Sequence, residues 1–213
     1  MRAEKEVTKS IKSGNRPAPL KPEGDWSHIF SYHPMDVEVQ RAEGIYYYDV
    51  DGNRYIDASG GPFAFTLPHG DPRMKQAISD QMEKFTHIHP TLASRPVADL
   101  CSKIATITPP QLNTTYLVSG GSEAVETAMK AARQHHVANG NQDKYKVISN
   151  YQSYHGMTLA TQGLSGNPSY EKYYGPMLTK WPHIHQYSDH VRPEGMTREE
   201  WGLKCAQRLE KLI

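Results

Sequence analysis

The sequence is poor in cysteine, nearly neutral and without a long apolar run. Its two cysteines, Cys101 and Cys205, lie far apart in helical patterns, which argues against a disulfide framework and favours a reducing, cytoplasmic location. The 24 basic residues are mixed with 23 acidic ones, for a net charge of +1, so neither nucleic acid nor an acidic membrane is expected as the main partner. No stretch reaches the length of a membrane span, about 20 residues, and residues 1–21 lack the apolar core of a signal peptide.

Three common nucleotide and nucleophile motifs are also missing. No Gly-Lys-Ser or Gly-Lys-Thr follows the glycines at 120 and 121, which argues against a nucleoside triphosphate loop, and there is no G-x-G-x-x-G for a dinucleotide. Residues 120–124, GGSEA, end in alanine where a hydrolase elbow needs glycine. Ser122 is therefore a poor candidate for a nucleophile.

Two pairs of histidines are spaced as metal ligands on a strand would be. His87 and His89 form one pair, and His183 and His185 form the other; residues two apart on a strand share a face. No carboxylate or thiolate lies at a matching spacing. We therefore predict no metal site.

Residues 114–156 form the best-defined unit of the chain. The β-branched and aromatic run at 114–118 predicts a buried strand that stops at the glycine turn 119–122. Small apolar residues then recur at the spacing of one helical face, which predicts a helix from Glu123 onward, and the apolar run 145–148 predicts the next strand. In such a crossover unit anionic ligands bind at the N-terminus of the helix.

The turn at 119–122 offers a place for a phosphate group. The first N–H groups of a helix have no partner within the helix, and the aligned peptide dipoles add a partial positive charge there. Val125 stands three residues after Ser122, so a capping box that starts at Ser122 is absent. Ser122 could cap the helix or donate its hydroxyl to a phosphate oxygen; the alternative is that the turn is only a tight connection.

Turn residues, helix-capping residues and the spacing of apolar residues predict several further elements. Asp51-Gly52-Asn53 predicts a hairpin between strands at 45–48 and 54–57. Asp71-Pro72 predicts a helix start and Ser94 another, with Pro109-Pro110 ending the second helix. A short helix is expected at 157–164, a strand at 181–187, and a last helix capped by Thr197 with Glu200 completing a capping box. The inward stripes expected on the first two helices are Met74, Ile78, Met82 and Phe85, and Val97, Leu100, Cys101 and Ile104.

The motifs at 119–126 (SGGSEAVE) and 153–158 (SYHGMT) together resemble the class III aminotransferases, pyridoxal-phosphate enzymes of fold type I. Residues 48–57 (YDVDGNRYID), 59–61 (SGG) and 67–69 (LPH) agree in order and spacing, and the resemblance spans roughly residues 29–213. It implies an α/β fold, the N-terminal part of the fold type I aminotransferase large domain, with a mostly parallel sheet and flanking helices. One departure is Pro68, where the family usually has glycine before the histidine.

The resemblance also implies a domain organisation. We expect an N-terminal arm at 1–28, a hairpin segment that is part of the small domain at 29–70, and a truncated large pyridoxal-phosphate-binding domain at 71–213. Proline-rich residues 16–22 suit an extended arm, either draped over a neighbouring subunit or partly disordered.

Site residues can be carried over from the family one by one. The resemblance implies that backbone N–H groups of Gly121 and Ser122 hold the cofactor phosphate, with Gly120 alongside. It implies that Tyr154 stacks on the pyridine ring; a loop tyrosine packed on the crossover is the alternative. The remaining implied residues are His155 as loop support, Gly156 for close passage, and Pro62 and Phe63 as the substrate pocket, unless these two are plain packing.

The catalytic residues of the family have no match in this chain. Pyridoxal phosphate needs a Schiff-base lysine and a carboxylate beside the pyridine nitrogen, and in the family both come from segments beyond the point matching Ile213. We therefore expect an incomplete chain, inactive alone, from an enzyme that moves an amino group from an amine or ω-amino acid to a 2-oxo acid. A homodimer is implied. The alternatives are a decarboxylase or aminomutase of the family, or a non-catalytic half-length protein that binds phosphate or a partner.

Overall fold

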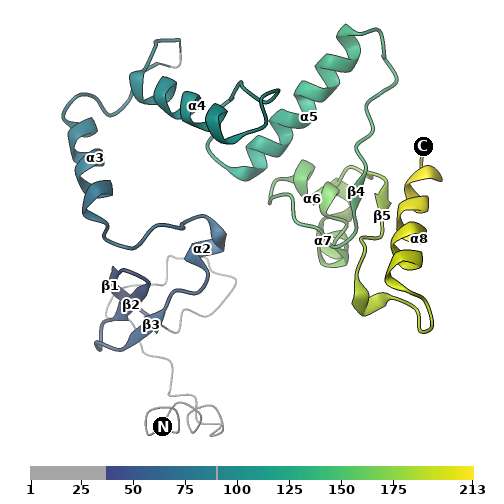
Figure 1. Ribbon diagram of the computed structural model, residues 1–213, viewed down its shortest axis with the longest axis horizontal. Coiled ribbons are helices and arrows are strands. Elements are labelled where there is room, and N and C mark those ends of the chain that lie inside the picture. Colours follow the sequence, from purple (N-terminus) through teal and green to yellow (C-terminus); the bar gives the residue numbers. More distant parts are fainter. Residues whose placement is uncertain (1–36, 90) are drawn as a thin grey trace, which may run out of the picture. The chain divides into compact units, whose positions relative to one another are not determined.

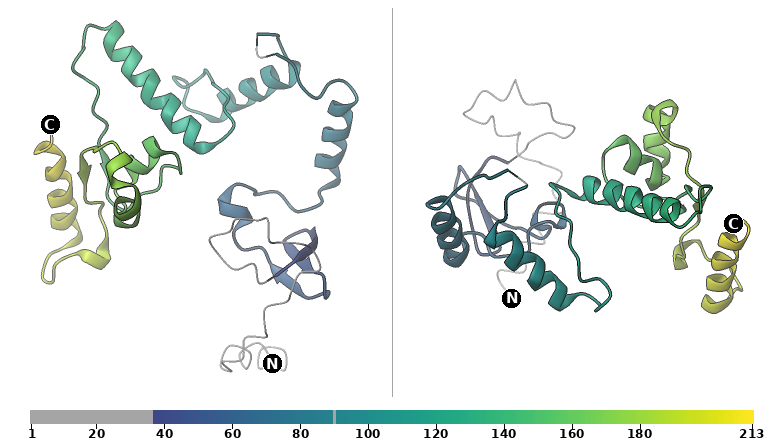
Figure 2. Two further views of the ribbon diagram at one scale, coloured as in Figure 1. Left: turned by 180° about the vertical axis from the view of Figure 1, so that it is seen from behind. Right: turned by 90° about the horizontal axis from the view of Figure 1, so that it is seen from above.

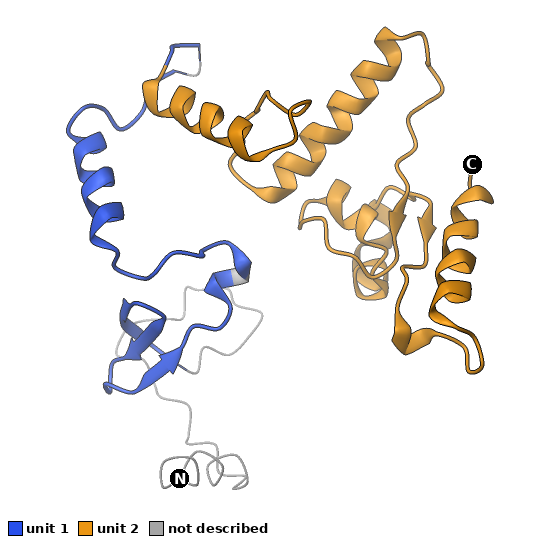
Figure 3. Cartoon of the chain, viewed as in Figure 1, with its two compact units in different colours: residues 1–93 blue, residues 94–213 orange. Residues whose placement is uncertain are grey.

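The computed structural model describes residues 37–89 and 91–213 (Figure 1). The predicted arm at 1–28 lies outside the described residues. The chain divides into two compact units, Met1–Ala93 and Ser94–Ile213 (Figure 3), and each is described by itself below. The boundary that the sequence predicts at residue 71, between the small-domain segment and the large domain, stays a prediction.

The first unit is built on a three-stranded antiparallel sheet in the order β1-β2-β3. Its strands are β1 (Val39–Glu43), β2 (Tyr46–Asp49) and β3 (Arg54–Ile56). The predicted hairpin is confirmed: Tyr46 pairs with Ile56 and Tyr48 with Arg54 across the β2–β3 turn. The first strand, β1, is an addition that the sequence did not predict.

Asp49 holds this hairpin turn together. Its side chain is fully buried, and its carboxylate accepts hydrogen bonds from the Asn53 backbone N–H (2.8 Å), the Asp51 N–H (3.0 Å) and the Tyr55 hydroxyl (2.9 Å). Burial opposes ionisation, but the hydrogen bonds from Asn53 and Tyr55 outweigh it and lower the pKa of the carboxyl. The turn therefore contains a buried charge whose partners come from the turn and from β3.

A second carboxylate, Asp57, joins the end of β3 to the following loop. One oxygen accepts from the Tyr47 hydroxyl at 2.7 Å and lies 2.9 Å from Nε2 of His69. The other accepts from the Gly60 N–H at 2.7 Å, at the start of the short helix α2 (Gly60–Phe63). The Tyr47 hydrogen bond, followed by that of His69, holds the pKa of Asp57 well below its usual range.

The remaining helices are mostly those that the sequence predicted. In the first unit, α3 (Pro72–Met82) begins where expected, and the Asp71 side chain accepts from the Arg73 N–H at 2.8 Å. The second unit contains α4 (Arg95–Ile107), α5 (Gly121–Ala138), α6 (Leu159–Ser165), α7 (Pro168–Tyr174) and α8 (Arg198–Glu210), with 3-10 turns at Gly175–Met177 and Asp189–Val191. The capping box of α8 is confirmed, because Thr197 and Glu200 exchange both hydrogen bonds. Among the described residues no helix is both long and apolar enough to cross a membrane.

Parallel pairing in the second unit is shorter than the sequence predicted. Strands β4 (Ser149–Asn150) and β5 (His183–Ile184) pair in parallel, and α6 packs against β4 (Figure 2). The predicted strand at 114–118 is wrong for this structure, since no described segment pairs with it and the Tyr116 side chain is 78% exposed. The strand predicted at 145–148 is displaced to Ser149–Asn150. Apolar, β-branched sequence favours a strand, but ladder hydrogen bonds need a neighbouring strand.

Burial concentrates around α6 and α8 rather than on the long helices. The buried apolar side chains are Leu164, Leu178, Trp201 and Cys205. The stripes predicted on α3 and α4 are not buried: Ile78 is 53% exposed and Leu100 is 48% exposed. Periodicity identified the apolar faces of these helices correctly, but a face is buried only where another element packs against it.

The Asp57 network predicts a pH dependence of stability. Because its folded pKa is lowered, the stabilisation is present above the unfolded pKa of about 3.9 and is lost as the pH falls below that value. We expect Asp57→Asn to lower the melting temperature at pH 7 and to flatten its decline between pH 5 and about pH 2.

Melting curves at a series of pH values, read by circular dichroism, measure this effect. Glu83→Gln serves as the control, because Glu83 is exposed and its carboxylate has no partner among the described residues. Equal slopes for Asp57→Asn and the unmodified protein would contradict the assigned role of Asp57.

Candidate functional site

The site is built on the start of α5. Gly120 is the N-cap residue in an extended conformation, and the helix begins at Gly121, two residues before the predicted start. The Glu123 carboxylate accepts a hydrogen bond from the Ser119 N–H at 2.7 Å. Counted from Gly120, Glu123 occupies the third helical position, where an acidic residue reaches back over the turn. A capping box counted from Ser122 does not include Glu123, so the sequence did not indicate this role of Glu123.

The amide groups at the start of α5 are open. Within the described part of the chain, the N–H groups of Gly121 and Ser122 donate to no protein acceptor. A Cβ atom added at Gly120 or at Gly121 would meet nothing within 4 Å. Two unpartnered donors at the positive end of an 18-residue helix fit an anion such as a phosphate group.

The loop at 153–158 packs directly on this helix start. The Met157 N–H donates to Oγ of Ser122 at 3.0 Å, and the Thr158 hydroxyl donates to a carboxylate oxygen of Glu126 at 2.5 Å. These bonds join residues more than thirty positions apart in the sequence. The structure therefore brings the two predicted motifs together.

Gly156 is the residue that permits this contact. It is buried and has a φ of +130°, a conformation that side chains other than glycine rarely adopt. An added Cβ would lie 2.3 Å from Oγ of Ser122 and 2.8 Å from Oγ1 of Thr161. Both the conformation and the space require glycine.

The Ser122 hydroxyl has a role that neither sequence interpretation included. The N-cap residue is Gly120 and not Ser122; the Ser122 oxygen accepts from the Met157 N–H instead. A hydroxyl that accepts a hydrogen bond still carries its own proton. Ser122 can therefore hold the loop and donate to an anion at the same time.

Tyr154 and His155 lie in the same loop, just before Gly156. The Tyr154 side chain is 69% exposed, so its ring is available to a ligand, and His155 is half-buried. Stacking of Tyr154 on a bound ring, and support of the loop by His155, stay predictions.

The predicted substrate-pocket residues lie in the first unit. Pro62 falls within α2, and its side chain is outside the described part. Phe63 ends α2 with a φ of +59°, is 86% exposed, and lines a pocket of about 280 Å³ together with Asp57 and Phe65. Their assignment to a substrate pocket stays a prediction.

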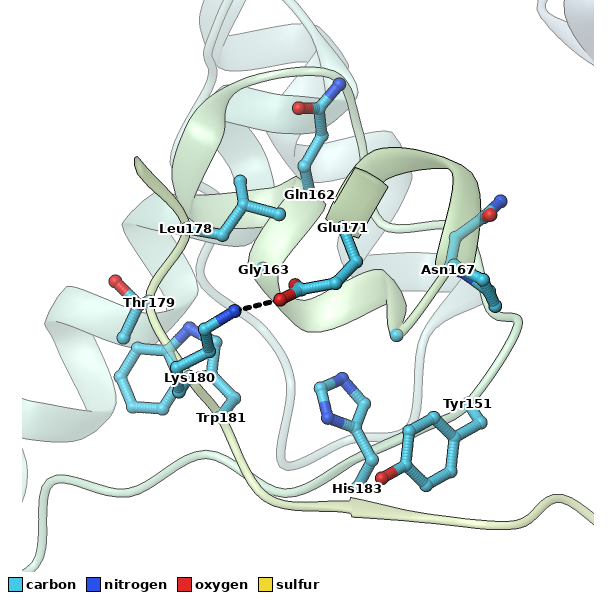
Figure 4. Close-up of a pocket in the computed structure, with 12 residues that line it drawn as sticks. Tyr151, Gln162, Gly163, Asn167, Glu171, Leu178, Thr179, Lys180, Trp181 and His183 are labelled. Carbon is cyan, nitrogen blue, oxygen red and sulfur yellow. Dashed lines mark hydrogen bonds and ion pairs between the residues drawn. The ribbon is translucent and has the colours of Figure 1, made fainter. Parts of the chain in front are cut away.

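A separate cavity of about 370 Å³ in the second unit was not predicted from the sequence (Figure 4). The rings of Tyr151 and His183 stack in its wall with centroids 4.9 Å apart, and Lys180 forms an ion pair with Glu171 across it. It contains none of the residues predicted to bind the cofactor. The open amides at the start of α5, rather than this cavity, form the candidate site.

Comparison with known proteins identifies the family of this chain. The family model of the class III aminotransferases matches residues 30–213 of this chain. This chain belongs to that family. Gamma-aminobutyrate transaminase 1, mitochondrial, of Oryza sativa subsp. indica is 33% identical over 189 residues, covering 85% of this chain and 36% of that protein. Gamma aminobutyrate transaminase 2 of Solanum lycopersicum is 34% identical over 183 residues, covering 82% and 39%.

Solved aminotransferase structures share the fold. An (S)-enantioselective omega-transaminase from Thermomicrobium roseum matches with a TM-score of 0.78 and 29% identity, over 99% of this chain and 46% of that one. The omega transaminase from Pseudomonas jessenii in complex with PMP matches with a TM-score of 0.79 and 26% identity, over 86% and 44%. The expected fold, the N-terminal part of fold type I, is confirmed. The chain spans about a third of the length of the curated relatives it matches.

The residues present fit the phosphate of pyridoxal phosphate, the cofactor of this family. Two free amides and one hydroxyl converge at the start of α5, the space over Gly121 is open, and an exposed tyrosine stands in the loop that packs there. These are the donors and the ring that a phosphorylated heterocycle requires.

Gly156→Ala tests the packing of the loop on α5. Its Cβ would overlap Ser122, so the Met157–Ser122 hydrogen bond must break, and we expect a loss of about 1–3 kcal/mol in the free energy of unfolding. Urea denaturation measures this loss.

Gly140→Ala is the matched control for Gly156→Ala. Gly140 also has a positive φ, +78°, but an added Cβ there meets nothing within 4 Å. It therefore reports backbone strain without overlap. Equal losses for the two variants would show that the close approach of Gly156 to Ser122 has no energetic weight.

Proposed function

We propose that the protein containing this chain is an aminotransferase that moves an amino group from an amine or ω-amino acid to a 2-oxo acid with pyridoxal phosphate. The observation that supports the proposal is the hydrogen bond from Met157 to Ser122, which joins the loop containing the exposed Tyr154 to the start of α5. Membership of the family supports the reaction class. The names of the relatives, gamma-aminobutyrate transaminases and omega-transaminases, support an ω-amino donor.

Each residue of the site has a proposed role. The Gly121 and Ser122 amides bind the phosphate, with Gly120 leaving space beside them; the Ser122 hydroxyl adds a third donor. Tyr154 covers one face of the ring, His155 supports the loop and Gly156 brings it close. When bound, the cofactor supplies an electron sink for the substrate. The Pseudomonas jessenii enzyme in complex with PMP supports this choice of cofactor.

These groups alone bind the cofactor weakly. A helix terminus contributes about 0.3–2 kcal/mol and an aromatic ring contact about 0.5–1.5 kcal/mol, whereas micromolar affinity needs about 8 kcal/mol. We therefore propose that the rest of the protein supplies the lysine that bonds the cofactor and the aspartate beside its pyridine nitrogen. A homodimer, with part of each phosphate site from the neighbouring subunit, is proposed for the same reason.

A second candidate is a non-catalytic half-length protein that binds phosphate or a partner. Exposed apolar side chains favour it: Tyr116 is 78% exposed, Leu112 is 64% exposed and Ile107 is 74% exposed, and such surfaces promote association. Within the family, decarboxylases and aminomutases share the motifs at 119–126 and 153–158. Product analysis separates these possibilities.

The proposed location is the cytoplasm, which suits the two free thiols, Cys101 and Cys205. The rice relatives are named as mitochondrial proteins, so the mitochondrion is the alternative. Cell fractionation with an antibody against the chain distinguishes the two.

The reaction is tested with the full-length protein, pyridoxal phosphate, an ω-amino acid and either pyruvate or 2-oxoglutarate. We expect the 2-oxo acid to be converted to its amino acid, as measured by chromatography. Release of carbon dioxide without amino transfer would indicate a decarboxylase. Absence of any conversion across several donors would overturn the aminotransferase proposal.

The cofactor site is tested by Tyr154→Ala and Gly121→Val. The first removes the ring contact and the second fills the open space over the amides, so we expect each to weaken pyridoxal phosphate retention about tenfold, which corresponds to ~1.4 kcal/mol. Dialysis followed by absorbance measures retention. Tyr145→Ala is the control, because Tyr145 is 59% exposed and lies outside the site. Retention unchanged in both site variants would refute the assignment.

A further inference from the structure

The Thr158 side chain does not cap its own helix, although it occupies the N-cap position of α6. Thr158 is the N-cap residue of α6, where threonine normally accepts a hydrogen bond from the helix. No such bond is present; the hydroxyl donates to Glu126 of α5 at 2.5 Å instead. A hydrogen bond to an ionised carboxylate is stronger than one between neutral groups, so the long-range partner prevails over the local cap.

A buried threonine fixes Thr158 from the other side. Thr161 is fully buried, and its Oγ1 lies 2.9 Å from Oγ1 of Thr158 and 3.1 Å from the Thr158 carbonyl oxygen. The Thr158 hydroxyl has one proton, which goes to Glu126, because an ionised carboxylate only accepts. Thr161 must therefore donate toward Thr158. Thr161 has a single hydroxyl proton, and it donates to the Thr158 carbonyl oxygen, so Thr161 fixes the backbone at Thr158 while Glu126 fixes the side chain.

The two bonds from α5 pin consecutive residues of the loop. Ser122 and Glu126 are four positions apart and so lie on one face of α5. Ser122 binds the backbone of Met157, and Glu126 binds the side chain of Thr158. Met157 and Thr158 directly follow the segment 154–156, which contains the exposed tyrosine. The C-terminal end of the segment 154–156 is thus fixed to α5 by two hydrogen bonds.

We propose that Glu126 is a positioning residue: through Thr158 it holds the loop of Tyr154 over the phosphate site at the start of α5. The Glu126–Thr158 hydrogen bond is named the latch. This inference rests on the proposed function, because it assigns the latch to the ring contact of the cofactor. Glu126 itself does not touch the ligand. The latch lowers the entropy lost when the ring is covered, since the loop is already in place.

The inference predicts that the latch affects the ring and not the phosphate. In the full-length protein, Glu126→Ala and Thr158→Val should each weaken pyridoxal phosphate binding about tenfold, which corresponds to ~1.4 kcal/mol. Inorganic phosphate has no ring, and its affinity should change less than about twofold, because the amides of Gly121 and Ser122 stay free. Titration calorimetry with both ligands measures the ratio of affinities.

Conservative variants and a control sharpen the test. Thr158→Ser keeps the hydroxyl and should retain the affinity for pyridoxal phosphate. Glu126→Gln keeps an uncharged acceptor and should fall between Glu126→Ala and the unmodified protein. Glu194→Gln removes an exposed carboxylate that has no hydrogen-bond partner among the described residues, and both affinities should be unchanged.

The outcomes separate the inference from the proposed function. If the unmodified protein binds no pyridoxal phosphate, the proposed function fails and the latch fails with it. If it binds but the two affinities fall in parallel in Glu126→Ala and Thr158→Val, the latch only supports the fold and the inference is overturned. Should Glu126→Ala not fold, the comparison of Thr158→Val with Thr158→Ser decides the matter.

Discussion

The site depends on the approach of Gly156 to Ser122. This contact brings a loop and a helix start together across more than thirty residues, and it tolerates no side chain at position 156. The Ser122 oxygen accepts the Met157 N–H, which leaves the hydroxyl proton and the neighbouring amides available to an anion. The same few atoms therefore connect the fold to the chemistry of the site.

Carboxylates that accept hydrogen bonds organise the local structure in both units. Asp49 and Asp57 hold the hairpin and the loop after it in the first unit. In the second, Glu123 closes the turn before α5 and Glu126 holds Thr158. Each case follows one physical rule: a charged acceptor orders backbone and hydroxyl donors more strongly than a neutral one. Two of these residues, Glu123 and Glu126, lie within the first turns of α5, so the helix itself stabilises the turn before it and the loop that packs on it.

Much of the local structure followed from residue type. The hairpin around Gly52, the start of α3 at Asp71 and the capping box at Thr197 depend on interactions within a few residues, and all three are present. The helix α5 begins at Gly121, two residues before the start that the sequence predicts, because Gly120 and not Ser122 is its N-cap residue. The strand at 114–118 and the buried stripe of α3 were wrong, since both require a distant segment that sequence periodicity cannot identify.

The sequence by itself determined the family, through two motifs whose spacing is characteristic, and it predicted which residues would bind a phosphate group. Only the tertiary structure decided how those residues meet: that Ser122 binds the loop instead of capping its helix, and that Thr158 turns to Glu126 instead of capping α6. The physical reason is the competition between near and distant partners. A short polar side chain can satisfy several acceptors or donors, and only packing determines which of them lies within reach.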